Sequence, residues 1–169
     1  MVIRPYAPGD LPRIQQITTD SFEGVSIDRN IEAEYGLVAG RDWKERKARD
    51  VGVDCQVQPD GVFVAEDAGV AIGYITTRLD RFTSIGRIPN LAVDPGYRGR
   101  GVGTLLIEHA IAWLRAHGMA MAKIETLVQN ERGQVLYPRF GFREVARQIH
   151  FVMPLDEPAA PPESGSEGG

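Results

Sequence analysis

The stretch of sequence that decides the fold is Arg98-Gly99-Arg100-Gly101-Val102-Gly103-Thr104. It follows an apolar segment, residues 88–93, that is typical of a strand, and it opens a run with apolar side chains at helical spacing, residues 102–116. Three glycines in residues 99–103 leave backbone N–H groups unshielded by Cβ atoms at the start of that helix, where they can converge on an oxyanion. The stretch therefore predicts a phosphate-binding turn, and its two arginines add positive charge.

Two better-known glycine-rich signatures do not fit this turn. A P-loop has a Lys followed by Ser or Thr after its last glycine, but here Thr104 follows Gly103 directly. A dinucleotide-binding fingerprint counted from Gly99 would have its third glycine at position 104. What remains is the pattern Arg98-x-x-Gly101-x-Gly103 between a strand and a helix, which resembles the acyl-CoA pyrophosphate loop of the GCN5-related N-acetyltransferase (GNAT) superfamily.

The resemblance extends on both sides of the turn, from residue 88 to residue 145. The preceding strand is similar to the one that lends backbone groups to the pantetheine arm in this family, and Phe140-Gly141-Phe142 resembles part of the second family motif. The resemblance implies acetyl-CoA as co-substrate. It implies contacts to acetyl-CoA from Leu91, Ala92, Val93, Arg98, Gly99, Arg100, Gly101, Val102, Gly103, Thr104 and Asn130.

Two side chains are candidates for catalysis. Tyr137 stands where the family places a tyrosine near the thioester sulfur, suited to protonating the leaving thiolate, although a buried structural tyrosine is the alternative. Many family members carry a Glu base before the glycine turn, but Asn90 occupies the comparable position here and cannot take a proton. Glu125 stands five residues before Asn130, as in the ribosomal-protein alanine N-acetyltransferases, and is the candidate base, with a surface or ion-paired Glu as the alternative.

The roles of several other residues are less specific. Asn130 either bonds to the pantetheine arm or caps the helix that follows, and both roles are compatible. His150 is a second candidate base. Cys55 lies far in sequence from both motifs, so we expect no acyl-enzyme role for it. The charges in residues 44–50 are expected to form a solvated helix face.

The order of elements predicts an α/β fold of the α+β type. We expect a GNAT-like mixed sheet of about seven strands flanked by about four helices, with a parallel strand pair splayed at the CoA-binding cleft. The expected strands are residues 2–3, 62–66, 71–76, 85–93, 123–128, 142–145 and 149–155, and the main expected helices are residues 10–22, 31–51 (interrupted near Gly36 and Gly40, with Trp43 as its packing anchor) and 102–116.

Length, composition and charge limit the number of domains, the partners and the location that we expect. The 169 residues suit a single acetyltransferase domain, residues 1–156, followed by a Pro-, Gly- and Ser-rich tail, residues 157–169, that we expect to be disordered. A formal charge of −4 argues against nucleic acid as a partner, and the chain shows neither a signal region nor an apolar run of membrane-spanning length. The single cysteine and the absence of C-x-x-C or His-x-x-x-His clusters predict no disulfide, no metal and a cytoplasmic location. We expect the chain to act as a monomer or homodimer.

The sequence thus favours an N-acetyltransferase that moves an acetyl group from acetyl-CoA to a primary amine by direct attack in a ternary complex. The acceptor, a protein N-terminus or a small-molecule amine, stays open, and so does the acyl chain length. A non-catalytic acyl-CoA-binding sensor is the alternative, because Asn90 replaces an acid.

Overall fold

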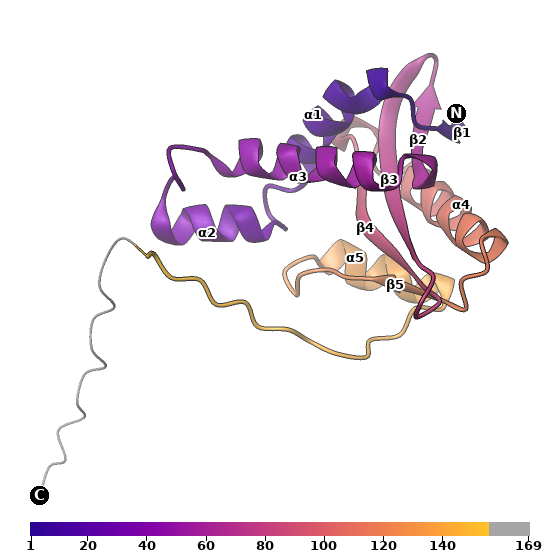
Figure 1. Ribbon diagram of the computed structural model, residues 1–169. Coiled ribbons are helices and arrows are strands. Elements are labelled where there is room, and N and C mark those ends of the chain that lie inside the picture. The colour runs from indigo at the N-terminus through magenta and orange to yellow at the C-terminus, as the bar shows by residue number, and fades with distance from the viewer. Residues whose placement is uncertain (156–169) are drawn as a thin grey trace, which may run out of the picture.

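The computed structural model describes residues 1–155, in which helices lie on both faces of a five-stranded sheet (Figure 1). The strands follow the order β1-β2-β3-β4-β5; the first four are antiparallel neighbours, and β5 runs parallel to β4. The mixed α/β architecture and its parallel pair are therefore confirmed. The strands are β1 (Val2–Pro5), β2 (Val62–Asp67), β3 (Val70–Asp80), β4 (Ile85–Val93) and β5 (Met121–Ile124), and the helices are α1 (Leu11–Ser21), α2 (Ile27–Tyr35), α3 (Trp43–Val57), α4 (Val102–Ala116) and α5 (Glu131–Leu136).

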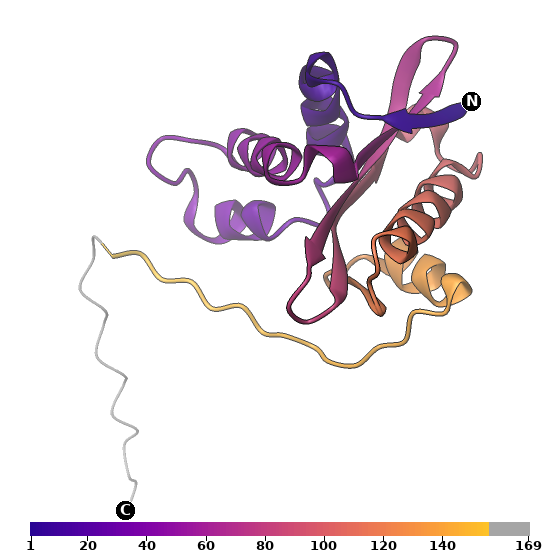
Figure 2. The ribbon, with the colours of Figure 1, turned by 45° about the vertical axis from the view of Figure 1, so that its right-hand side comes forward.

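The core lies on both faces of the sheet. Helix α4 packs on one face, where Leu106 and Ile75 are fully buried, whereas α1 and α3 cover the opposite face around Ile14 and Tyr74 (Figure 2). Because both faces are covered, β2 and most of β3 are continuous runs of buried residues rather than alternating ones. Within residues 1–155, no helix combines the length and the apolar character that crossing a bilayer requires.

Strand β4 contains a bulge at its centre. Thr76 of β3 pairs with Asn90, and Arg78 pairs with Arg87, so the single residue between them on β3 faces both Ile88 and Pro89 of β4. Pairing of β4 with β5 ends at Ile88 opposite Ile124, immediately before a proline that has no N–H to donate. The two parallel strands therefore separate at Pro89, which produces the expected splay.

The segment between α1 and β2 folds differently from the expectation of one interrupted helix over residues 31–51. Helix α2 ends at Gly36, whose φ of 76° is left-handed, and α3 begins after Asp42, whose carboxylate accepts a hydrogen bond from Glu45 N at 2.8 Å. Trp43, at 4% exposure, is buried at the start of α3, as expected of a packing anchor. Two separate helices result, and α3 extends to Val57.

The expected terminal strands, residues 142–145 and 149–155, are wrong, because residues 142–155 form no strand. A two-stranded pair is marginal in water and needs a sheet edge to dock on. Strand β5 is only four residues long, since it ends at Ile124 instead of residue 128. The segment runs along an extended path and reaches α2, where the Tyr35 hydroxyl donates to Val152 O at 2.8 Å (Figure 1). His150 is exposed within it, and the tail predicted for residues 157–169 lies outside the described residues.

Candidate functional site

The glycine turn presents backbone amides at the start of α4. Gly99 and Gly101 have φ values of 75° and 80°, and Gly101 is the N-terminal cap of the helix. The N–H groups of residues 102–104 belong to the first helical turn and have no intrahelical acceptor, because the first backbone bond of the helix runs from Leu105 N to Gly101 O. Space is open around both glycines where a Cβ would stand. The turn can therefore accept an anion at close range.

Positive charge surrounds these amides. The Arg100 guanidinium lies 5.0 Å from the centre of the Tyr97 ring. Burial, followed by the positive charge of Arg132 on α5, lowers the pKa of Arg98, and the charge of Asp94 opposes that effect. Like charges gathered beside unpaired amides favour the binding of a di-anion such as a pyrophosphate.

The segments of the two sequence motifs meet at Gly103. A Cβ placed there would lie 3.7 Å from Leu136 of α5 and 3.9 Å from Val93 at the end of β4. The start of α4, the end of β4 and α5 are therefore in contact. The structure brings together the turn, the strand before it and the segment that carries Tyr137, as the sequence predicts.

Strand β4 has a free backbone edge beyond the splay. Asp94 N donates to Ile72 O on β3 at 2.9 Å, and successive residues of a strand point their backbone groups to opposite edges. Ala92 therefore directs its N–H and C=O to β3, whereas Leu91 and Val93 direct theirs to the side that β5 has left. Ser21 Oγ donates to Val93 O at 3.0 Å on that side, so the groups left for a ligand are the N–H of Val93 and both backbone groups of Leu91.

Asn130 and Tyr137 lie together across α5. The Asn130 carboxamide accepts from Gly133 N at 3.1 Å, which confirms its capping role, and donates to Thr126 Oγ1 at 2.8 Å. A Cβ on Gly133 would stand 2.7 Å from Asn130 Nδ2 and 2.9 Å from the Tyr137 ring, so only glycine permits this approach. Burial raises the pKa of Tyr137, while a hydrogen bond with Thr126 acts in the opposite direction. The phenol therefore stays protonated at neutral pH and can donate a proton.

Glu125 follows β5 directly and is exposed. Its carboxylate pairs with Lys123 at 2.5 Å, so the ion-paired alternative is present. It also lines an open hollow of about 270 Å³ with Pro89, next to the point where β4 and β5 separate. Glu125 thus lies at the splay, on the sheet face that α3 covers.

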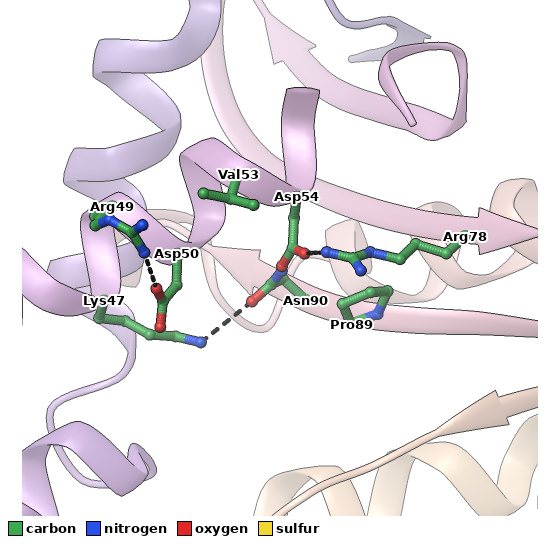
Figure 3. A pocket seen from close by; sticks show the side chains of 8 residues that line it. All are labelled: Lys47, Arg49, Asp50, Val53, Asp54, Arg78, Pro89 and Asn90. Atoms are coloured by element: carbon green, nitrogen blue, oxygen red, sulfur yellow. Dashed lines mark hydrogen bonds and ion pairs between the residues drawn. The ribbon is translucent and has the colours of Figure 1, made fainter. Parts of the chain in front are cut away.

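A hydrogen-bonded network that the sequence did not reveal connects α3 to β4 (Figure 3). Asn90, only 3% exposed, donates from Nδ2 to Asp54 Oδ2 at 2.5 Å and to Thr76 Oγ1 at 3.1 Å. Arg78 donates to the other oxygen of Asp54, and Lys47 Nζ donates to Asn90 Oδ1 at 3.3 Å. These side chains border a second hollow of about 330 Å³. Asp54 lines both hollows.

The sequence did carry a signal for this network. Lys47, Asp50 and Asp54 are spaced three and four residues apart, so they share one face of α3. The expectation of a solvated face over residues 44–50 is wrong for two residues. Arg46 is 17% exposed and pairs with Asp28, and Lys47 is half-buried against the sheet with its ammonium 4.8 Å from the Phe22 ring centre. Cys55, in contrast, faces the core, and burial raises the pKa of its thiol to about 11. A thiol in that state is a poor nucleophile, as expected.

Comparison with known proteins identifies relatives of the chain. The model of the acetyltransferase (GNAT) family matches residues 13–142. The chain is 32% identical over 159 residues, 92% of its length, to a mycothiol acetyltransferase of Acidimicrobium ferrooxidans. It is 34% identical over 80 residues, 47% of its length, to the ribosomal protein bS18-alanine N-acetyltransferase of Salmonella typhimurium. The chain spans about half the length of these curated relatives, 51% of each.

Solved structures share the fold. The paia N-acetyltransferase of Thermoplasma acidophilum, in complex with coenzyme A, superposes with a TM-score of 0.63 at 21% identity, covering 84% of this chain and 89% of that one. At this level of identity the similarity establishes the architecture.

The network around Asn90 makes a prediction about stability. Asn90→Ala removes the donor to Asp54 Oδ2 and the side-chain donor to Thr76 Oγ1, while Arg78 and the backbone N–H of residue 90 still reach these two residues. It should lower the free energy of unfolding by about 1–3 kcal/mol, measured by urea denaturation. The control is Asn30→Ala, which removes an exposed carboxamide bonded to Gln129 and should change the free energy by less than about 0.5 kcal/mol. Equal effects of the two substitutions would show that the network does not hold α3 on β4.

Proposed function

The chain belongs to the acetyltransferase (GNAT) family, and on that premise we propose that it transfers an acetyl group from acetyl-CoA to a primary amine by direct attack in a ternary complex. The observation that carries this proposal is the free edge of β4. It begins where β4 and β5 separate at Pro89 and ends at the amide turn of residues 98–104. A pantetheine arm can extend along such an edge as an added strand while its pyrophosphate binds the turn.

Each backbone group then has a role in the transfer. Leu91 and Val93 would bond to the pantetheine amides, and an amide near Leu91 would polarise the thioester carbonyl. The side chains of Arg98 and Arg100 would add charge near the pyrophosphate. Asn130, although it already caps α5, would reach the pantetheine arm from the opposite side of the cleft.

The reaction needs two proton transfers. The acceptor nitrogen, freed of its extra proton, attacks the thioester carbon, and the tetrahedral oxyanion collapses with cleavage of the C–S bond. We assign the proton from the amine to Glu125, directly or through a water, because its carboxylate lies in the hollow beside the splay. The leaving thiolate takes the proton of the Tyr137 hydroxyl, whose raised pKa keeps it available.

The acceptor class is part of the proposal. The two curated relatives are named for different molecules, mycothiol and the alanine of ribosomal protein bS18, so we keep both a small-molecule amine and a protein N-terminus as acceptors. A second candidate function is a sensor that binds acyl-CoA without turnover. The observation that favours it is Asn90, the residue before Leu91 on β4. Its side chain is an amide that is bonded to Asp54 and Thr76, so β4 offers no carboxylate there to act as a base.

The amide turn is tested by Gly101→Ala. A Cβ at a φ of 80° strains the backbone and covers the amides, so acetyl-CoA affinity measured by calorimetry should fall at least about tenfold. The control is Gly118→Ala at the other end of α4, with a φ of 77° and about 22 Å away. Both variants should lose similar stability, about 1–2 kcal/mol. A similar loss of affinity in both would contradict the proposed turn.

The role of the phenol is tested by Tyr137→Phe. Removal of the hydroxyl should lower kcat about 100-fold while the dissociation constant of acetyl-CoA changes by less than about twofold, because the ring still fills its place. Release of free CoA in the presence of a panel of amines gives the rate, and Tyr6→Phe serves as a tyrosine control far from the turn. Acetyl-CoA binding without turnover of any amine by the unchanged protein would favour the sensor.

A further inference from the structure

Three cations stand in register across the sheet. Arg87 of β4 pairs directly with Arg78 of β3 on one side and with Lys123 of β5 on the other. Residues paired in this way present their side chains on the same face, and like charges directly opposite one another destabilise a sheet. The row stands out in a chain whose formal net charge is −4. An anion bound over it would offset the repulsion.

The row lines the hollow of about 270 Å³ that adjoins the splay, together with Asp54 and Glu125. The two outer cations are already neutralised, because Arg78 pairs with Asp54 and Lys123 pairs with Glu125. Arg87, between them, has no carboxylate within 4.0 Å among residues 1–155, and the Asp80 carboxylate interacts with it only at longer range. The lining of the hollow therefore has one more positive than negative charge, and Arg87 is the cation without an ion-pair partner in that lining.

The neighbouring hollow shows the same imbalance. There Asp54 is again paired with Arg78, and Asp50 pairs with Arg49 at 3.4 Å. Lys47 is bonded only to the Asn90 carboxamide and the Phe22 ring within residues 1–155. Both hollows on this face are thus net positive, which opposes a polycationic acceptor and favours one that carries an acid group.

The position of Arg87 limits where that acid group stands on the acceptor. Arg87 and Leu91 pair with Arg78 and Ile75 of β3, which are three residues apart, so the bulge leaves them about 10 Å apart along the sheet. The thioester is proposed to lie near Leu91. An α-carboxylate adjacent to the reacting amine is too close to that amine to reach Arg87. An acid at the end of a side chain, on an amino acid or on the residue after a peptide N-terminus, suits the separation better.

We propose that Arg87, flanked by Arg78 and Lys123, forms a subsite for a side-chain carboxylate of the acceptor, so that the favoured acceptor is an amine carrying a side-chain acid. This inference rests on the proposed acetyl transfer and names the acceptor class for that same site. Asn90 and Pro89 lie between the subsite and the reacting centre and set their spacing.

The test compares acceptors matched in shape but not in charge. Glutamate against glutamine, and the peptide Ala-Glu-Ala against Ala-Gln-Ala, are assayed for release of free CoA; the two pairs separate a free amino acid from a peptide as the source. In at least one pair the acid should have a kcat/KM about tenfold higher than its amide. Arg87→Gln should remove the preference for the acid by raising KM for the acid alone, and Arg87→Lys should restore part of this preference. The control is Arg115→Gln, on the exposed side of α4, which should leave the preference unchanged.

A binding measurement keeps this inference separate from the proposed activity. With saturating CoA, the better acid of the two pairs should raise the melting temperature of the protein, and neither its amide nor the same acid with Arg87→Gln should do so. Equal shifts for acid and amide, or a preference unchanged by Arg87→Gln, would overturn the subsite even if acetyl transfer occurs. The opposite outcome is also distinguishable. If the protein neither binds CoA nor turns it over, but the acid still raises the melting temperature without CoA, the proposed function is overturned and the subsite is kept.

Discussion

The separation of β4 from β5 at Pro89 is the constraint on which the rest of the site depends. The bulge at Ile88 and Pro89 ends the parallel ladder and leaves the backbone groups of Leu91 and Val93 without a strand partner on one edge. Because only a short 3-10 helix, Pro95–Tyr97, separates β4 from the glycine turn, this part of the chain offers strand N–H and C=O groups first and helix-start amides last. A normal strand pair here would close that path with its own hydrogen bonds.

The two faces of the sheet differ in polarity near the point where β4 and β5 separate. Helix α4 buries the apolar face through residues such as Leu106 and so fixes the turn at its own N-terminus. On the other face, α3 contributes polar side chains, and Asp54 holds Asn90 and Arg78 at the border of the two hollows. Around the two hollows the face that α3 covers is therefore charged and hydrogen-bonded, whereas the face under α4 is apolar.

Much of this arrangement was predictable because it is local in sequence. The turn, β4, α4, Asn130 and Tyr137 lie within 60 residues, and glycine spacing and helical periodicity identify them. The spacing of Lys47, Asp50 and Asp54 shows that they share one face of α3, but their partner Asn90 was not predictable, because it meets Asp54 only through tertiary packing. The same holds for residues 142–155, whose alternating apolar residues predict strands but whose pairing depends on the length of β5.

The central claim is that acetyl-CoA binds along the free edge of β4 and ends on the amide turn. Hydrogen–deuterium exchange with and without saturating acetyl-CoA tests it most directly, because it reports on the backbone groups themselves. Binding along this edge should slow exchange at Leu91, Val93 and residues 99–104 and leave exchange in β2 unchanged. Slower exchange confined to α1–α3, or no change at residues 91–104 under saturation, would contradict it.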